Sequence, residues 1–179
     1  MKIQDGYMHA HYRYSPITLY SYLIAIIDII IAQLLRPKNV TFHFPIEIAF
    51  PSQWKKYKRG IRFINIIEQV AGFFHVSILW ENISWLHTHD WSLKEQMQWK
   101  KVPPKIKICF DTGHAMLGTK NPRAKITQIL TRYGDRIKHI HLHENDLLHD
   151  LHLPPHKHLT KPFVNQIIKN RTWIIEKSS

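Results

Sequence analysis

Residues 76–81, Val-Ser-Ile-Leu-Trp-Glu, are an apolar run that ends in a carboxylate. A short, nearly continuous apolar run is typical of a strand buried on both faces of a parallel sheet. Further runs of this kind also end in an imidazole or a carboxylate. Because the carboxyl ends of the strands of a parallel barrel converge on one face, these end residues are expected to meet there and to form a cage for Zn²⁺ or Mn²⁺. They are His9, His43, Glu81, Asp111, His141 and Glu176.

Longer stretches with helical spacing of apolar residues separate the runs. The predicted helices span residues 17–35, 54–73, 92–100, 123–133 and 160–169. Short strands that alternate with helices predict an α/β fold, in which helices cover a parallel sheet. About six β/α units can be counted, and the chain has 179 residues, whereas a complete eightfold barrel needs roughly 250. The predicted fold is therefore an incomplete TIM-type barrel, with residues 1–179 forming a single domain.

The composition bounds the cellular setting and the partners. The single cysteine, Cys109, excludes an intrachain disulfide and fits a reducing compartment. The first residues lack the apolar segment of a signal peptide, so a cytoplasmic protein is expected. The net charge of +12 indicates either affinity for nucleic acid or the composition of a lysine-rich proteome. No arginine-rich run concentrates this charge, which favours the second interpretation.

One apolar segment, residues 19–35, resembles a membrane span in composition. A span needs about 20 apolar residues with few or no charges, and Asp28 lies in the middle of this segment. Pro16 at its start, with Ser15 as N-cap, is typical of an ordinary helix opening. We therefore predict a buried barrel helix and no membrane partner.

Two further stretches carry candidate ligands. Asp150 and His152 are two residues apart within the histidine-rich stretch 139–158, so both can face one ion from an extended or loop backbone. Such a stretch can also be a nonspecific metal trap or a polar loop. In the other stretch, Asp111 is followed by Thr-Gly-His. Gly113 is expected to permit a tight turn that lets His114 point back beside Asp111.

These motifs together resemble those of the xylose isomerase-like TIM barrels, the superfamily of endonuclease IV and of sugar phosphate isomerases and epimerases. They occur in the family's order and cover nearly the whole chain, so that the strands correspond to the third through eighth of the family barrel. The matching stretches are Met8–Tyr12, Thr41–Pro45, Trp80–Asn82, Phe110–Ala115, Ile140–Asp146, Asp150–Pro154 and Ile175–Glu176.

The resemblance implies a multinuclear metal site that would hold Zn²⁺ or Mn²⁺, with Co²⁺ as a further candidate. It assigns the central ion to Glu81, Asp111, His141 and Glu176. A second ion would be held by Glu81 together with His9 and His43. A third set would hold an ion in a nuclease or contact substrate hydroxyls in an isomerase, and it consists of His114, Asp150 and His152.

The chain also departs from the family pattern. The first two strands have no counterpart, so an N-terminally truncated barrel, an open barrel or a barrel closed across a dimer is expected. In each case the strand that leads to His9 should be an exposed edge, which favours self-association into a homo-oligomer. The family's glycine-containing loop is replaced by Pro155-His156-Lys157-His158, so close approach of this backbone to a ligand is not expected.

Three functions follow from these features. The first is a metal-dependent isomerase or epimerase of a small sugar or sugar phosphate, with Glu81 and Glu176 exchanging a proton next to a carbonyl. The second is an endonuclease IV-like zinc phosphodiesterase that acts at abasic sites in DNA, where the basic charge would assist phosphate binding. The third is a non-catalytic barrel fragment that keeps the ligands. We favour the first, because the stretches around Asp111 and His141 resemble those of epimerases.

Overall fold

The computed structural model describes residues 2–4, 6–10, 17–49, 53–82 and 102–176. These residues belong to two compact units. The first contains residues 1–81 and 92–106, and the second contains residues 82–91 and 107–179. The predicted helix at 92–100 lies outside the described residues. The prediction of a single domain stays a prediction.

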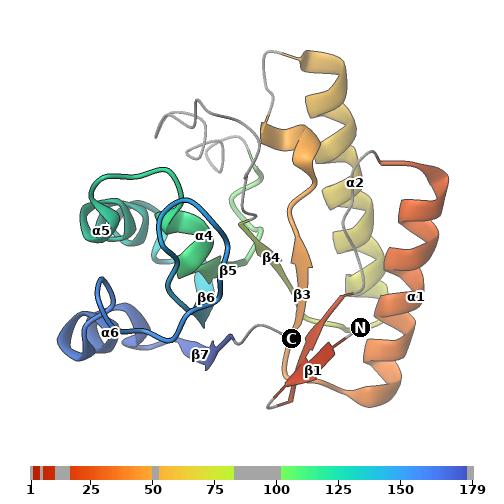
Figure 1. Cartoon of the computed structure of the whole chain (residues 1–179). Helices are drawn as coiled ribbons and strands as arrows, with labels where there is room; N and C mark the ends of the chain where they lie inside the picture. Colours follow the sequence, from red (N-terminus) through yellow and green to blue (C-terminus); the bar gives the residue numbers. More distant parts are fainter. Residues whose placement is uncertain (1, 5, 11–16, 50–52, 83–101, 177–179) are drawn as a thin grey trace. The chain divides into compact units, whose positions relative to one another are not determined.

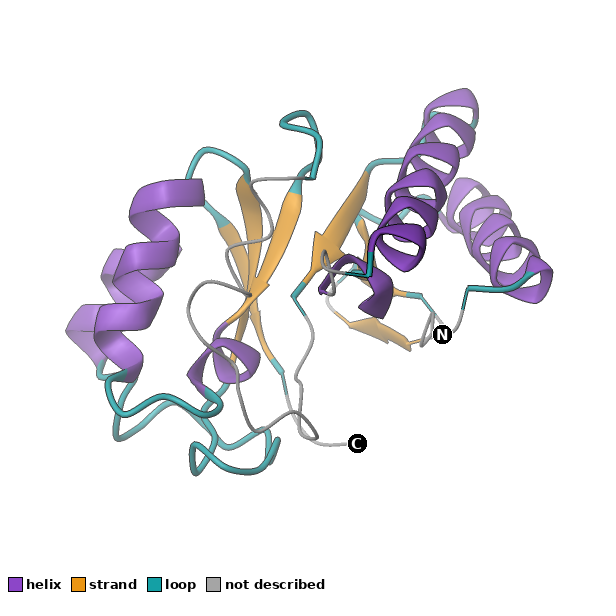
Figure 2. Ribbon diagram, turned by 90° about the horizontal axis from the view of Figure 1, so that it is seen from above, coloured by secondary structure: helices purple, strands orange, loops and turns teal. Residues whose placement is uncertain are grey.

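The first unit contains a four-stranded sheet whose last three strands are parallel (Figures 1 and 2). Its strands are β1 (Lys2–Gln4), β2 (Tyr7–His9), β3 (Val40–His43) and β4 (Ile78–Glu81). The register pairs His43 with Glu81, so two of the predicted ligands end neighbouring strands at the same level.

The prediction that β2 is an exposed edge strand is wrong, because β1 pairs with β2 in antiparallel orientation and covers its edge. The hairpin joins Gln4 to Tyr7, and Gly6 has a φ of 81°. A left-handed residue of this kind is required in the tight turns that join antiparallel strands. The dipeptide Asp5-Gly6 was the sequence signal for this hairpin.

Helix α1 (Leu19–Leu35) begins two residues later than predicted. Its N-cap is Thr18, whose side chain accepts a hydrogen bond from the backbone N–H of Ser21, while the Ser21 hydroxyl accepts one from the backbone N–H of Thr18. This reciprocal capping replaces the predicted cap at Ser15, which lies outside the described residues. In the part of the chain that the structure describes, no helix is long and apolar enough to cross a membrane.

Helix α2 (Trp54–Phe73) follows the short 3-10 helix η1 (Ile46–Ala49) and matches its predicted bounds. Its buried face includes Phe63, which makes an edge-to-face contact with Trp80 of β4. The indole Nε1 of Trp80 donates a hydrogen bond to Glu68 at 2.8 Å. The opposite face is basic and exposed, and it carries Lys55, Lys56, Lys58, Arg59 and Arg62.

The second unit has three parallel strands, β5 (Ile108–Asp111), β6 (Ile137–Leu142) and β7 (Thr172–Ile175). Register pairs Asp111 with His141 and Leu142 with Ile175, so the carboxyl ends of the strands are level. The helices of this unit are α4 (Thr112–Met116), α5 (Pro122–Tyr133) and α6 (Lys161–Ile168). The predicted bounds of α5 and α6 are correct to within one residue.

The two helical glycines of α2 allow a matched test of packing. A Cβ on Gly60 would lie 2.7 Å from Cγ2 of Ile48 and 3.2 Å from the Ile48 backbone nitrogen, whereas a Cβ on Gly72 would meet nothing within 4 Å. Alanine gains up to about 1 kcal/mol over glycine in a helix, but overpacking costs about 1–3 kcal/mol. Urea unfolding should therefore show Gly60→Ala to be destabilising and Gly72→Ala neutral or stabilising. Equal effects would refute the close contact of α2 with η1.

Candidate metal-binding site

In the first unit, the ends of three adjacent strands bring two imidazoles to one carboxylate. Nε2 of His9 lies 2.9 Å from Oε2 of Glu81, and Nε2 of His43 lies 3.5 Å from the same oxygen. The Glu81 side chain is 1% exposed, and the imidazoles are 22% and 28% exposed. The group therefore places a buried anion beneath two accessible imidazoles, which is a donor set that suits a divalent cation.

In the second unit, Asp111, His141 and Glu176 form a corresponding group. Nδ1 of His141 lies 3.3 Å from Oε2 of Glu176 and 3.9 Å from Oδ2 of Asp111. The three side chains each offer a ligand atom within 4.8 Å of the others. Asp111 and His141 are buried, and Glu176 is 15% exposed.

The Asp111 backbone is held in place by Asn82. The Asn82 side-chain oxygen accepts a hydrogen bond from the N–H of Asp111 at 2.8 Å, and its amide nitrogen donates to the Asp111 carbonyl at 2.9 Å. Both backbone polar groups of Asp111 are therefore bonded to this one side chain. Asn82 belongs to the family-like stretch Trp80–Asn82, but the sequence predicted no role for it. The structure shows that it positions the Asp111 backbone.

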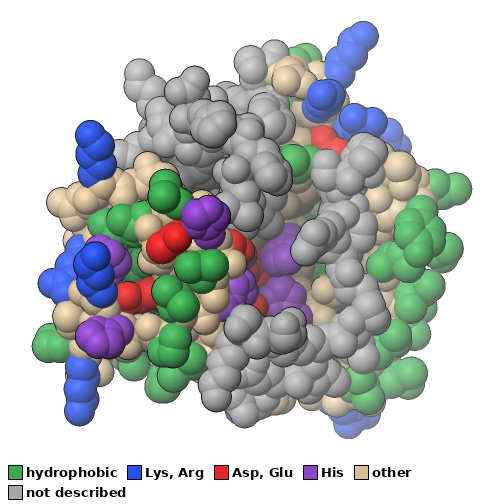
Figure 3. Space-filling view, viewed as in Figure 1, with side chains coloured by type: hydrophobic (Ala, Val, Ile, Leu, Met, Phe, Trp, Pro, Cys, Tyr) green, Lys and Arg blue, Asp and Glu red, His purple; other side chains and the backbone are tan. Residues whose placement is uncertain are grey.

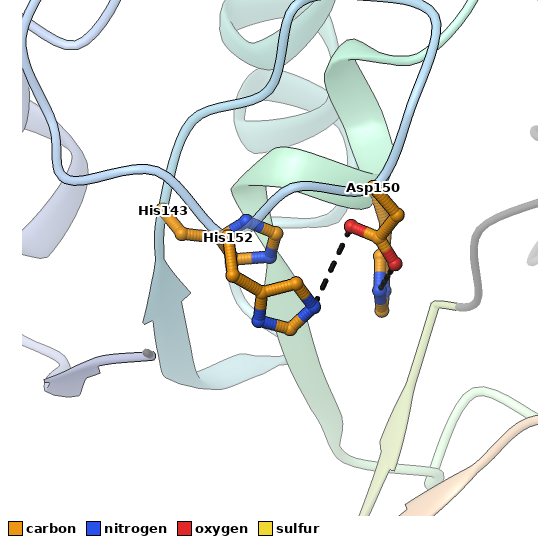
Figure 4. Close-up of side chains that lie close together, drawn as sticks. His143, Asp150 and His152 are labelled. Atoms are coloured by element: carbon orange, nitrogen blue, oxygen red, sulfur yellow. Dashed lines mark hydrogen bonds and ion pairs between the residues drawn. The ribbon is translucent and has the colours of Figure 1, made fainter. Parts of the chain in front are cut away.

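A second cluster in the same unit surrounds Asp150. Nε2 of His114 lies 3.1 Å from Oδ2 of Asp150. On the other side of the carboxylate, Nε2 of His152 lies 3.5 Å from Oδ1, as Figure 4 shows. Burial alone would raise the pKa of Asp150, but its hydrogen bonds to both imidazoles hold that pKa well below its ordinary value. The cluster thus keeps a negative charge among histidines, and its members His114, His143, Asp150 and His152 could hold a metal ion.

His143 is the central residue that the sequence prediction did not include among the ligands. Its ring stacks on that of His152 with centroids 4.1 Å apart, and its Nε2 lies 2.9 Å from both carboxylate oxygens of Asp111. Burial alone would lower the pKa of His143, but the charge and hydrogen bond of Asp111 outweigh it and raise that pKa. Side chains two apart on a strand share a face, so the pair His141 and His143 was the available signal.

Gly113 serves a purpose different from the predicted tight turn. It lies inside α4, and a Cβ at this position would overlap the ring of His143. His114 does lie beside Asp111 as predicted, because the Asp111 carboxylate caps α4 by accepting the backbone N–H of His114 at 2.7 Å. Gly113 is therefore required by the imidazole packed against it.

The loop after β6 is held by two polar side chains. The Glu144 carboxylate accepts hydrogen bonds from four successive backbone N–H groups, those of residues 156–159. Oδ1 of Asn145 accepts from the N–H groups of Leu151 and His152, and its amide nitrogen donates to Asp150 at 3.2 Å. These contacts order the segment that replaces the family's glycine-containing loop, and His152 adopts a φ of 50° without glycine.

Cys109, His139 and His141 form another group, buried along the same face of β5 and β6. The hydroxyl of Thr172 donates to the carbonyl of Lys138, so it accepts the hydrogen bond from Nδ1 of His139 at 2.7 Å. The proton of a neutral His139 therefore resides on Nδ1.

Comparison with known proteins identifies the family and the fold. Residues 26–175 match the model of the xylose isomerase-like TIM barrel family, and the chain belongs to that family. The structure is similar to the TTHB071 protein from Thermus thermophilus soaked with ZnCl2, with a TM-score of 0.68. It is also similar to a D-tagatose 3-epimerase-like protein, with a TM-score of 0.69. In both cases the identity is 18%, and the match covers 96% of this chain and 70% of the other. No curated protein matches the chain.

The predicted family and the predicted α/β fold of an incomplete TIM-type barrel are thus confirmed. Buried groups of histidine and acidic residues that could hold a metal are present in the structure.

The overlap of Gly113 with His143 predicts a non-additive effect. Gly113→Ala should displace the imidazole and destabilise the protein by about 1–3 kcal/mol, as overpacking does. In a His143→Ala background the added methyl group has room, so the same substitution should cost little. A double-mutant cycle in urea unfolding measures this coupling. Additive costs would show that Gly113 has another role.

Proposed function

We propose that this protein is a divalent-metal-dependent isomerase or epimerase of a small sugar or sugar phosphate. The observation that carries the proposal is the group of Asp111, His141 and Glu176 at the level ends of neighbouring strands. Membership of the xylose isomerase-like family and the structural likeness to an epimerase-like protein support it.

The residues present fit a divalent cation. Ligand atoms bound at about 2.0–2.1 Å in a tetrahedron lie about 3.3 Å from one another, and Nδ1 of His141 lies 3.3 Å from Oε2 of Glu176. That Glu176 oxygen is buried and forms no hydrogen bond within the described residues, and it faces the imidazoles of His141, His143 and His152 at 3.3–4.0 Å. Burying a carboxylate oxygen in this way is costly unless a cation compensates it.

Each predicted residue has a role in this proposal. Glu81, Asp111, His141 and Glu176 would be the ligands of the catalytic ion, and His9 and His43 would join Glu81 around a second ion. When bound, such an ion polarises a carbonyl and its neighbouring hydroxyl. Glu81 and Glu176 would move the proton at the adjacent carbon, as general base and general acid.

The second cluster would serve the substrate. Asp150 would accept hydrogen bonds from substrate hydroxyl groups, while His114 orients its carboxylate and His152 completes the cluster. The contact of His143 with Asp111 resembles the carboxylate–imidazole pairs that orient metal-site side chains.

The second candidate function is that of an endonuclease IV-like zinc phosphodiesterase. The observation in its favour is that His114, Asp150 and His152 come together with His143 in a further group that could hold a metal ion. Metal content distinguishes the candidates. About three zinc ions per chain would favour the nuclease, and about one Mn²⁺ or Co²⁺ the isomerase. A chain that binds none would be a non-catalytic fragment.

The carboxylates provide the direct test of catalysis. Glu81→Gln and Glu176→Gln should each lower the rate of ketose epimerisation by roughly a hundredfold or more, because the amide can neither exchange the proton nor balance the ion's charge. Glu68→Gln is the matched control, since Glu68 is bonded to Trp80 and lies outside the candidate site. Turnover is measured across a panel of ketoses and their phosphates with Mn²⁺, Co²⁺ or Zn²⁺. Full activity in both variants would refute the proposed roles.

Binding to DNA provides a separate test. The dense basic cluster of the described residues lies on the exposed face of α2, and Arg123 is engaged with the His158 carbonyl and the Thr160 hydroxyl. We expect weak duplex binding and no cleavage at an abasic site. Tight binding that falls steeply with salt, together with such cleavage, would establish the nuclease function instead.

A further inference from the structure

Helix α1 presents an uncharged apolar face to solvent. Its one acidic or basic residue, Asp28, is buried. Hydrophobic side chains gather over this helix at the edge of the molecule (Figure 3). The exposed fractions are 86% for Leu19, 65% for Tyr20, 53% for Leu23, 41% for Ile27, 40% for Ile30, 76% for Leu34 and 51% for Leu35.

The spacing of this face is that of a helix-pairing surface. Tyr20, Leu23, Ile27, Ile30 and Leu34 follow one another at intervals of three, four, three and four residues. This alternation is the a/d repeat of a coiled-coil seam, and these five residues are called the α1 seam below.

The core of the first unit does not use the α1 seam. The buried side of α1 carries other residues, namely Ser21, Ala25, Asp28, Ile29 and Ala32, and Tyr22 makes an edge-to-face contact with Phe63 of α2. A surface helix needs one apolar stripe for its own core, and a helix that is apolar all round is normally buried. The α1 seam is thus a second apolar stripe on the same helix.

We propose that the α1 seam is a dimer interface that binds the same seam of a second copy of this chain. Seven apolar side chains of α1, between 40% and 86% exposed, line the helix from its first residue to its last, and a continuous apolar surface of this length suits the patch that a stable protein interface buries. Each chain has a net charge of +12, so two copies repel each other wherever their basic groups come close. The α1 seam carries no charged side chain, and contact there adds no such repulsion. A self-complementary contact of this kind closes with two-fold symmetry and leaves no open surface for further growth.

Charge sets the orientation of the two helices. The groove beside the first turn of α1 is lined by Lys58, Arg59 and Arg62 of α2. An antiparallel pair places these basic groups at opposite ends of a 17-residue helix, about 25 Å apart, which is well beyond the screening length of about 8 Å in physiological salt. A parallel pair would place them side by side. The dimer is therefore antiparallel, with Ile27 at its two-fold axis.

The first test is a charge at the centre of the α1 seam. Ile27→Glu places two like charges at the axis and should weaken dimerisation by roughly a hundredfold or more. Phe73→Glu is the matched control, because Phe73 is an exposed apolar residue at the end of α2, outside the seam. Sedimentation equilibrium over a concentration series measures both variants. A monomeric wild-type chain at all concentrations, or equal effects of both substitutions, would overturn the proposal.

The second test reports the orientation. The single native cysteine is buried, so an introduced cysteine on α1 is the accessible thiol. Ile27→Cys should form an intermolecular disulfide under mild oxidation, since a disulfide needs Cα atoms about 4.4–6.8 Å apart. Leu34→Cys should not, because it lies about 10 Å along the helix from the axis. Cross-linking of Leu34→Cys as fast as Ile27→Cys would refute the antiparallel pair, and cross-linking of neither would refute the interface.

Discussion

The carboxylate of Asp111 accepts a hydrogen bond from the backbone N–H of His114 and another from the ring of His143. The first caps helix α4, and the second brings a buried imidazole against the start of that helix. Because Gly113 lies beneath this imidazole, its missing side chain is part of the same arrangement. One carboxylate therefore positions both His114 and His143, and Asn82 in turn fixes the backbone of Asp111.

The candidate site combines buried acids with imidazoles that other side chains orient. His139 is held by Thr172, and His114 by the carbonyl of Asn82 and by Asp150. Hydrogen bonds of this kind fix the orientation of each ring, as second partners do at metal sites. Histidines with a purely structural role also form hydrogen bonds. The feature that distinguishes a candidate metal site is the gathering of several carboxylates and imidazoles at one place.

The first unit shows how one helix can serve two surfaces. One side of α1 is buried within the first unit, and large apolar residues remain exposed on the other side. The association expected at an exposed edge of β2 is not available there, because β1 pairs with that strand. The apolar surface of α1 offers a different route to self-association, through side-chain packing in place of backbone hydrogen bonds.

The sequence by itself determined the alternation of strands and helices, the family, and the six strand-end residues, because hydrophobic periodicity and end residues are local properties of the chain. It placed helix α2 correctly and α1 within two residues, since an amphipathic pattern extends over many residues. Tertiary structure alone decided the contact of His143 with Asp111, the need for glycine at Gly113, and the support of the loop at residues 156–159 by Glu144. These depend on residues about 12 to 32 positions apart, whose distance in space is set by strand register and packing, which no local pattern encodes.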